Sequence, residues 1–410
     1  MKLSQACSLD CELPAGIVPV PASCNPTASG YLPTLDGWRA IAILGVLVCH
    51  GSDALFNNSG LYPSDRWYGL TRYGAFGVDI FFGLSGFLIC TRLLQERRRD
   101  GDISLAGFYI RRAFRILPPY LTYLIIVGLL GYVGVLTVHR WEWLSSLLFF
   151  RNYIAAREGG WYLAHFWSLA VEEHFYLIWP GLLVLLGSRR ARWAAVILAL
   201  SVAAWRVLDF REQWLSHLVG ADCYIRTDAR LDALLWGCWI ALMLDSPGGR
   251  AFLTSRMTLA AWTTLFGTLV CCVAYRPPLA MLWEAMLVPL VLAGTVLKPA
   301  SLVGRFLESQ PMRWIGRISY SLYVWQQLFL VRSQEPHPLP MGLLRAFPIN
   351  IVCVFVVAAA SYYLIERPLI GVGHSLSSRI TSKETSAGVE MVAAPRLPDG
   401  SATERYACSG

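Results

Sequence analysis

Charged residues are scarce in this sequence, at 15% of 410 positions, while 55% of the residues are hydrophobic and the mean hydropathy is +0.48. This balance excludes an ordinary soluble domain, in which about a quarter of the residues are charged. The net formal charge of +8 could indicate nucleic-acid binding. However, Lys and Arg fall in short clusters between apolar runs, which is typical of membrane-protein loops, so we expect no nucleic-acid partner.

Motifs for several kinds of chemistry are missing. The eleven cysteines include no CxxC pair and no Cys/His metal spacing, which argues against a zinc site or a disulfide framework. Neither a Walker motif nor a dinucleotide-binding motif is present, so nothing indicates a nucleotide-driven machine. We expect no metal. No long soluble stretch occurs, and any chemistry must therefore lie within or at the rim of a membrane bundle.

Apolar runs near the bilayer requirement of about 20 residues predict an all-α, polytopic transmembrane helical bundle of about ten membrane-spanning helices. The candidate spans are 38–56, 74–95, 115–137, 162–187, 193–209, 229–245, 257–275, 279–297, 315–332 and 345–366. An even number of spans places both termini on one side. The basic clusters fall on that side, and the positive-inside rule makes it cytoplasmic. We expect a multi-pass protein of the cell (inner) membrane.

The two ends of the sequence differ from its middle. Residues 1–30 mix Cys, Pro and Gly without the continuous apolar core of a signal peptide, and they predict a loose cytoplasmic N-terminal tail. Residues 371–410 are rich in Ser, Ala and Pro, and they predict a disordered cytoplasmic C-terminal tail. The transmembrane domain is then residues 31–370.

One apolar run, WRAIAILGVLVCHGS at 38–52, carries a titratable side chain toward each end. Arg39 and His50 are eleven positions apart, which on an ideal helix returns them to within about 20° of one face, roughly 16 Å apart along the axis. A guanidinium near the cytoplasmic interface could hold a phosphate while an imidazole works deeper. The alternative is a snorkelling Arg and a His hydrogen-bonded within the bundle.

A second polar constellation lies in FWSLAVEEHFYLIWP, residues 166–180. Ser168, Glu172 and Tyr176 follow one another at four-residue spacing and so share one helix face. Glu172 and Glu173 point about 100° apart, so we expect at most one of them to face a shared cavity. A buried Glu could orient an imidazole and raise its basicity. An intramembrane salt bridge to an Arg of another helix is the other possibility.

The stretch FYIRRAFRILPPY at 108–120 adds a basic pair at the start of a span. Arg112 and Arg115 share a face at i, i+3, which gives a two-guanidinium clamp suited to phosphates. The same arginines could equally be an ordinary positive-inside anchor.

In TDARLDALLWG, residues 227–237, polar residues enter a span from the opposite side. Thr227, Arg230 and Asp232 could bind the hydroxyl groups of a substrate, or simply pair with one another. We expect them, with Glu173, to be the substrate-binding residues.

Small residues mark GVDIFFGLSGFLI at 77–89. Gly83 and Gly86 would let helices approach closely, so we expect helix packing first and the lining of a narrow channel second. Ser85 lies between them.

The order of these segments resembles the membrane-bound acyltransferase family 3, whose members decorate polysaccharides, lipopolysaccharide, peptidoglycan and some secondary metabolites. The resemblance covers about residues 31–370. It rests on LDGWRAIAILGVLVCH with its Arg-x10-His pattern, FFGLSGFLI, RRAFRILPPY, FWSLAVEEHFYLIWP, TDARLDALLWG, ISYSLYVW and the closing ERP at 366–368.

The resemblance implies an integral-membrane O-acyltransferase, most commonly an O-acetyltransferase in this family. It would move an acyl group from cytoplasmic acetyl-CoA, or another acyl-CoA cosubstrate, to a hydroxyl at or across the membrane. The acceptor would be a carbohydrate, a glycan or a polyketide-type molecule, and membrane lipids would surround the protein.

Carried over to this sequence, the resemblance implies that His50 is the essential catalytic histidine and Arg39 its motif partner. The Glu of the family's WSLxxE pattern falls on Glu172 rather than Glu173. In this hypothesis His50, oriented by Glu172, acts as general base or as a transient acyl carrier. The thioester reaches toward His50 from one compartment and the acceptor hydroxyl arrives from the other. The expected donor-binding residues are Arg39, Arg112 and Arg115.

Two departures from the family pattern are visible. Many relatives have His after the Tyr-x-Trp of the ninth span, where this sequence has Gln326. The C-terminal tail is too short for the extracytoplasmic esterase-like domain that some relatives append, so a second transfer step would need another protein. A rival function is a glycan or lipid transporter or flippase in which His50 and Glu172 form a proton relay. It predicts two similar halves, and no convincing internal match is found.

Overall fold

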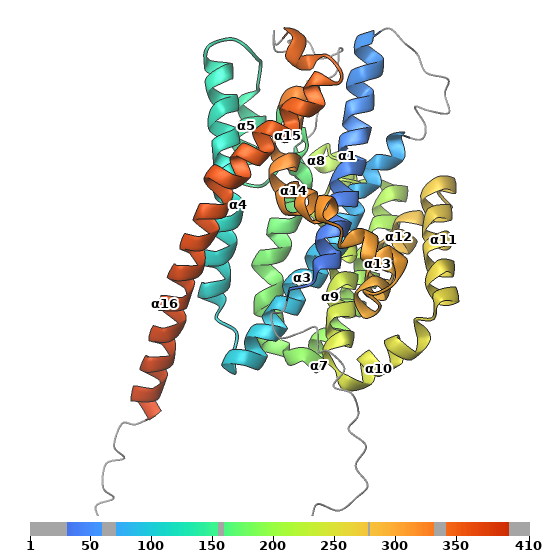
Figure 1. Cartoon of the computed structure of the whole chain (residues 1–410), viewed down its shortest axis with the longest axis vertical. Helices are drawn as coiled ribbons and strands as arrows, with labels where there is room; N and C mark the ends of the chain where they lie inside the picture. The colour runs from blue at the N-terminus through green and yellow to red at the C-terminus, as the bar shows by residue number, and fades with distance from the viewer. Residues whose placement is uncertain (1–30, 60–70, 155–159, 278, 332–341, 393–410) are drawn as a thin grey trace, which may run out of the picture. The chain divides into compact units, whose positions relative to one another are not determined.

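The computed structural model describes residues 31–59, 71–154, 160–277, 279–331 and 342–392 (Figure 1). Within these ranges all regular structure is helical and no strand occurs, as the sequence predicts for an all-α bundle. The N-terminal tail expected over residues 1–30 lies outside the described residues.

Ten longer helices form most of the described chain. They are α1 (Pro33–Ser59), α3 (Gly77–Asp100), α4 (Leu105–Tyr132), α7 (Phe166–Glu212), α9 (Leu231–Asp245), α11 (Leu259–Tyr275), α12 (Ala280–Leu297), α14 (Gln310–Phe329), α15 (Ile349–Ser361) and α16 (Arg367–Val392). Short helical turns connect them. These are η1 (Tyr73–Phe76), α5 (Arg140–Leu147), η2 (Arg151–Tyr153), α6 (Trp161–Ala164), α8 (Trp214–Val219), η3 (Thr227–Ala229), α10 (Pro247–Arg256), α13 (Leu302–Leu307), η4 (Gly342–Arg345) and the π turn η5 (Tyr362–Glu366).

Helix α7 consists of two arms. Gly187 breaks it with φ 66° and ψ 166°, a conformation that glycine adopts readily because it has no Cβ. We call residues 166–186 the first arm and residues 188–212 the second arm. This break separates the two candidate spans that the sequence places at 162–187 and 193–209.

The expected count of ten spans is not confirmed. Every candidate span falls on a helix, but only five described segments are long and apolar enough to cross a membrane, or six if the bent pair of α10 and α11 counts as one. Helices α9 and α11 have only 15 and 17 residues, which is short for a hydrocarbon core of about 30 Å. Helix α14 carries Arg313 and Arg317. Length and hydropathy therefore do not give ten independent spans.

Close helix packing explains the glycines of residues 77–89. Helix α3 packs along α9, and a Cβ added to Gly86 would lie 1.9 Å from the backbone oxygen of Leu234. A Cβ on Gly237 would lie 2.4 Å from the backbone oxygen of Gly83. The two helices touch through their backbones at these points, which confirms the expected packing role. Helix α1 packs in turn against both α3 and α14.

Helix α16 corrects the expected boundary of the C-terminal tail. Composition assigns residues 371–410 to a disordered tail, but α16 continues to Val392 and packs along α4. Arg111 donates a hydrogen bond to the hydroxyl of Ser377 at 2.5 Å, and Gly373 lies against the side chain of Phe114. These contacts stabilise a helix whose polar sequence alone does not predict one.

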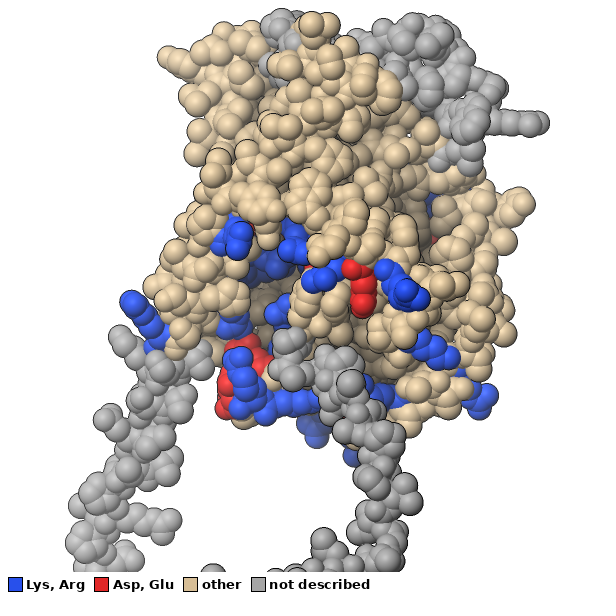
Figure 2. Space-filling model, viewed as in Figure 1, with Lys and Arg blue, Asp and Glu red and all other residues tan. Residues whose placement is uncertain are grey.

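Basic residues gather at one end of the bundle. On the face shown in Figure 2, Lys and Arg side chains surround a hollow in the lower half, whereas the upper half shows few of them. This is the end at which α7 and α10 carry their labels in Figure 1. The basic side chains visible on this face thus gather toward one end of the bundle.

Candidate functional site

A small cavity lies among α1, α3, α4, the first arm of α7 and α14. Its volume is about 80 Å³, which leaves room for a few water molecules. The structure brings four of the residues predicted from the sequence to this one cavity, although they come from three helices. The polar side chains that line it are Arg39, Ser85, Arg112, Arg115, Ser168, Glu172, Ser319, Tyr320 and Tyr323.

The carboxylate of Glu172 is held from three directions. Oε1 accepts a hydrogen bond from Ser85 at 2.8 Å, and Oε2 accepts one from Tyr176 at 3.0 Å. Nη2 of Arg112 lies 3.6 Å from Oε2, and its guanidinium stacks 3.6 Å above the ring of Tyr176. The expected face of Ser168, Glu172 and Tyr176 is present, and Ser85 lines the cavity as the second role for its segment predicts.

Arg112 connects both adjacent carboxylates. It lies 3.4 Å from Glu173 as well as 3.6 Å from Glu172. Only Glu172 lines the cavity, which agrees with the expectation that at most one of the two would. The intramembrane salt bridge, left open by the sequence, is therefore formed. Glu173 makes an ion pair instead of facing the space in which a substrate would lie.

Positive charge dominates the other wall of the cavity. Arg39 lies 3.8 Å from Asp36, one helical turn earlier on α1. Arg115 also lines the cavity, close enough to Arg39 for the two guanidinium groups to repel each other. Among the described residues, no carboxylate lies within 4.0 Å of Arg115. Two guanidinium groups facing one space form a site for an anion such as a phosphate.

A buried acid behind this wall was not singled out by the sequence. Glu366 is 1% exposed, lies in the π turn η5 and accepts a hydrogen bond from Ser321 at 2.9 Å. Its charge interacts favourably with Arg115 and Arg39. The only sequence signal was its place in the closing ERP motif, and π turns recur at functional sites.

His50 lies outside the cavity lining and has a different partner from the one expected. Its Nδ1 is 3.1 Å from Oε1 of Gln326, and Trp161 packs edge-on with its ring centroid 5.4 Å from the imidazole. Gln326 is fully buried, and its Nε2 has no hydrogen-bond partner among the residues that the structure describes. The contacts of Glu172 are with Ser85, Tyr176 and Arg112, so the structure gives the orienting position beside the imidazole to Gln326.

A polar layer separates His50 from the cavity. The hydroxyls of Ser168 and Tyr323 lie 2.6 Å apart, and Tyr323 donates to the backbone oxygen of His165 at 2.6 Å. The His165 ring bridges Oε1 of Gln327, at 2.6 Å, and the backbone oxygen of Val324, at 3.2 Å. Tyr323 is one helical turn before Gln326 on α14, which places this layer between the cavity and the imidazole.

Arg39 and His50 therefore occupy two depths of α1, as their spacing predicts, but do not share one open space in this structure. Arg39 lines the cavity, whereas His50 does not. The groups between the cavity and His50 are hydroxyls, amides and an imidazole that are hydrogen-bonded to one another.

The residues expected to bind an acceptor are mostly engaged in buried ion pairs. Arg230 is 2% exposed and lies 2.6 Å from Asp79, while Asp232 is 1% exposed and lies 2.8 Å from Arg206. The sequence left open that Arg230 and Asp232 pair with each other. Pairing does occur, but with partners from α3 and the second arm of α7.

Thr227 belongs to a buried hydrogen-bond network rather than to the cavity. Its hydroxyl accepts a hydrogen bond from the amide of Asn152 and lies 2.7 Å from Nδ1 of His174, with the same distance to the Asn152 nitrogen. None of Thr227, Arg230 and Asp232 lines the cavity.

Comparison with known proteins identifies the family. A family model described as an acyltransferase domain matches residues 32–367, which include the cavity, His50 and Glu366. The chain belongs to acyltransferase family 3. Within the matched domain, Glu172 and the three expected donor-binding arginines line one cavity, and His50 lies beyond the polar layer. The chain carries the domain of an enzyme that transfers acyl groups.

Relatives of this family-3 chain are named as peptidoglycan O-acetyltransferases. YrhL of Bacillus subtilis, assigned to that group by its name, is 31% identical over 387 residues, which cover 85% of this chain and 56% of YrhL. The peptidoglycan O-acetyltransferase OatA of Listeria monocytogenes is 26% identical over 382 residues, covering 83% and 56%. The O-acetyltransferase OatA of Staphylococcus aureus is 26% identical over 369 residues, covering 83% and 57%. The chain spans about half the length of these relatives. No solved structure matches it.

Proposed function

We propose that this protein is an integral-membrane O-acetyltransferase that uses cytoplasmic acetyl-CoA to acetylate a hydroxyl of a cell-envelope glycan. The family and the names of its relatives support acetyl transfer to a glycan. The observation that carries the donor assignment is the convergence of Arg39 and Arg115 on one cavity. A doubly cationic wall suits the phosphates of coenzyme A.

In this proposal the basic end of the bundle faces the cytoplasm and Arg39 and Arg115 bind the donor phosphates. Arg112 has a different task, because it already forms ion pairs with Glu172 and Glu173. The cavity of about 80 Å³ is smaller than a pantetheine arm, so donor entry requires its walls to move apart. The polar layer of Ser168, Tyr323 and His165 lies on the way from this cavity to His50.

The chemical step places a base at His50. When Nδ1–H donates to Oε1 of Gln326, Nε2 is the unprotonated ring nitrogen. Nε2 takes the proton of the acceptor hydroxyl while the oxygen of that hydroxyl attacks the thioester carbonyl. The new C–O ester bond forms, the C–S bond breaks, and the proton passes to the leaving thiolate. General-base help of this kind typically supplies roughly 10²–10⁴-fold. The acyl-histidine route would instead first form a C–N bond to the imidazole as the C–S bond breaks and the thiolate leaves. The acceptor hydroxyl would then form the C–O ester bond as the C–N bond breaks.

The test is transfer of labelled acetyl groups in membranes that contain this protein. Wild type should transfer label from acetyl-CoA to glycan, and His50→Ala should lower transfer by about 10²-fold or more because the base is lost. Val48→Ala, a change at an exposed position of the same helix, is the matched control and should retain activity. Equal labelling by wild type and His50→Ala would overturn the role of His50. Labelling by none of the three would overturn acetyl-CoA as donor and favour transport.

Variants of Gln326 test the orienting contact separately. Gln326→Leu should lower kcat with little change in the KM for acetyl-CoA, because Gln326 contacts the imidazole and not the donor cavity. Gln326→His, which introduces the residue that the family resemblance implies at this position, should restore much of the rate. An unchanged kcat in Gln326→Leu would contradict a positioning role.

A further inference from the structure

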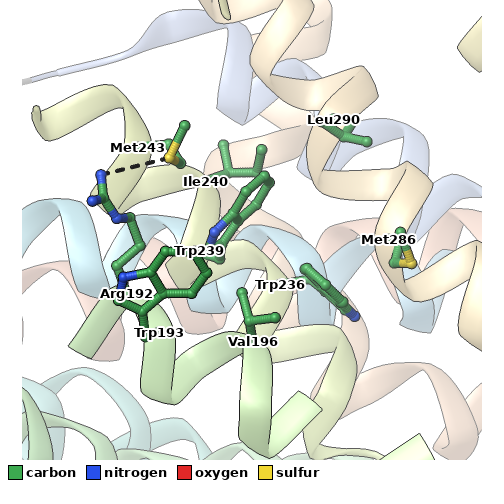
Figure 3. A pocket seen from close by; sticks show the side chains of 9 residues that line it. All are labelled: Arg192, Trp193, Val196, Trp236, Trp239, Ile240, Met243, Met286 and Leu290. Carbon is green, nitrogen blue, oxygen red and sulfur yellow. Dashed lines mark hydrogen bonds between the residues drawn. The ribbon is translucent and has the colours of Figure 1, made fainter. Parts of the chain in front are cut away.

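A second hollow lies apart from the candidate site, among the second arm of α7, α9 and α12. Its volume is about 570 Å³, several times that of the cavity lined by Arg39 and Arg115. Figure 3 shows that indole rings and thioether side chains make up most of its wall, including Trp193, Trp236, Trp239 and Met286. We call it the tryptophan groove. An apolar hollow of this size on a membrane protein favours a hydrocarbon ligand.

One end of the tryptophan groove carries a single cation. Nη1 of Arg192 lies 3.8 Å from Sδ of Met243, and a thioether is only a weak acceptor. Among the described residues, no carboxylate lies within 4.0 Å of Arg192. Figure 3 shows Arg192 beside Met243 at one end, with Trp236 and Met286 toward the other. The guanidinium of Arg192 therefore lies beside the apolar wall with no counter-charge from the described residues.

The helix registers fix the direction of the groove. Arg192 lies five residues after the break at Gly187, next to the exposed Arg189 and Arg190, which mark the basic end of the bundle. From Met243 to Trp236 on α9 the wall extends seven residues, roughly 10 Å along the axis. The tryptophan groove therefore begins at the basic interface and extends into the apolar part of the bundle.

We propose that the tryptophan groove is a binding site for an anionic phospholipid, with the lipid phosphate on Arg192 and one acyl chain along the tryptophans. An unpaired guanidinium at the interface attracts a phosphate, and the wall beyond it offers contact only to hydrocarbon. A zwitterionic lipid supplies the same chains but no net negative charge. The site therefore distinguishes lipids by headgroup. It does not depend on the proposed acetyl transfer.

The test compares two lipids on the purified full chain in detergent. Dioleoylphosphatidylglycerol should raise the Tm by several degrees more than dioleoylphosphatidylcholine, because a ligand that binds only the folded state stabilises it. Arg192→Gln should lose this difference and Arg192→Lys should keep part of it. Arg190→Gln, which removes a neighbouring exposed charge outside the groove, should behave as wild type.

A second variant tests the apolar wall. Val196→Trp places a large ring in the tryptophan groove and should abolish the stabilisation by phosphatidylglycerol while Arg192 remains. Native mass spectrometry of the same samples should show one retained phosphatidylglycerol on wild type and none on Val196→Trp. Equal stabilisation by both lipids in wild type, or an unchanged difference in Arg192→Gln, would overturn the proposal.

Discussion

At the scale of single residues, Arg112 and Arg115 have different surroundings although they are only three positions apart. Arg112 lies within 3.6 Å of two carboxylates. Arg115 lines the cavity, and no carboxylate of the described chain lies within 4.0 Å of it. The sequence treats them as one phosphate clamp. The structure separates a residue that holds carboxylates from one that can bind an anion.

Substitution of the two arginines should therefore give opposite phenotypes. Arg115→Gln removes a charge-assisted contact of about 1.5–3 kcal/mol, so the KM for acetyl-CoA should rise roughly 10- to 100-fold. Its loss of stability should be smaller than that of Arg112→Gln, because Arg39 remains near the buried Glu366. Arg112→Gln leaves Glu172 and Glu173 buried without a counter-charge, which costs on the order of 3 kcal/mol and should lower the Tm. Kinetics with acetyl-CoA and thermal unfolding in detergent measure both effects. A large KM effect in Arg112→Gln at unchanged Tm would contradict this division.

Residue types and spacings predict much of the cavity because helical periodicity is a local property. The spacing of Ser168, Glu172 and Tyr176 places them on one face, and the structure confirms it. His50 and Gln326, which contact each other, are 276 positions apart in the chain. No local pattern specifies such a contact, which depends on how α1 packs against α14. The pairing of Arg230 with Asp79 is equally remote from any sequence signal.

At the scale of helices, the contact between α3 and α9 is set by glycine. A Cβ at Gly86 would lie 1.9 Å from a backbone oxygen of Leu234, and backbone cannot move aside as a flexible side chain can. Helix α3 also carries Ser85, which donates to Glu172 of α7, and Asp79, which pairs with Arg230 at the start of α9. A shift of α3 away from α9 would disturb these contacts.

Gly86→Ala should therefore lower the Tm by several degrees and also reduce acetyl transfer. Its matched control is Gly267→Ala in α11, where an added Cβ meets nothing within 4 Å. Alanine is favoured over glycine in a helix by about 1 kcal/mol, so the control should be neutral or slightly stabilising. If Gly86→Ala unfolds at the wild-type temperature, the conclusion that α3 and α9 have no space for a Cβ at Gly86 is wrong.

The lengths of elements are less predictable than their positions. Each candidate span falls on a helix, but no apolar run predicts α16, which extends 22 residues past residue 370. Its second half is polar, and the contacts that support its beginning, such as Arg111 with Ser377, come from α4. Composition cannot reveal such tertiary support. The sequence also does not show that Gly187 adopts the non-helical backbone conformation that divides α7 into two arms.

At the scale of the whole molecule, the loop segment around η3 is tied to its surroundings by ion pairs. Asp228 lies outside the membrane-spanning helices. Burial alone would raise the pKa of its carboxyl, but hydrogen bonds from Arg226, Trp205 and Tyr153 lower the pKa below its ordinary value of 3.8. Arg226 also pairs with Asp209 near the end of α7 at 2.7 Å. These contacts connect the loop to the bundle.

Stability should therefore fall in acid. A carboxyl whose folded pKa is depressed contributes stability that is complete above its unfolded pKa of about 3.9 and is lost as the pH falls toward the lower folded pKa. The Tm of the purified protein should decrease from pH 5 toward about pH 3. Asp228→Asn should be less stable at pH 7 and should show a shallower decrease. Parallel curves for the two proteins would contradict the contribution of Asp228.

The polar layer of Ser168, Tyr323 and His165 has a consequence for the membrane as an electrical insulator. In the proposed function, donor and acceptor stand on opposite sides of a membrane that maintains a proton gradient. A permanently open, water-filled conduit would dissipate that gradient. Under that proposal, the hydrogen-bonded hydroxyls and the backbone oxygen of His165 would limit ion leakage in the resting protein, and the acyl carrier would have to fill the path while it is open.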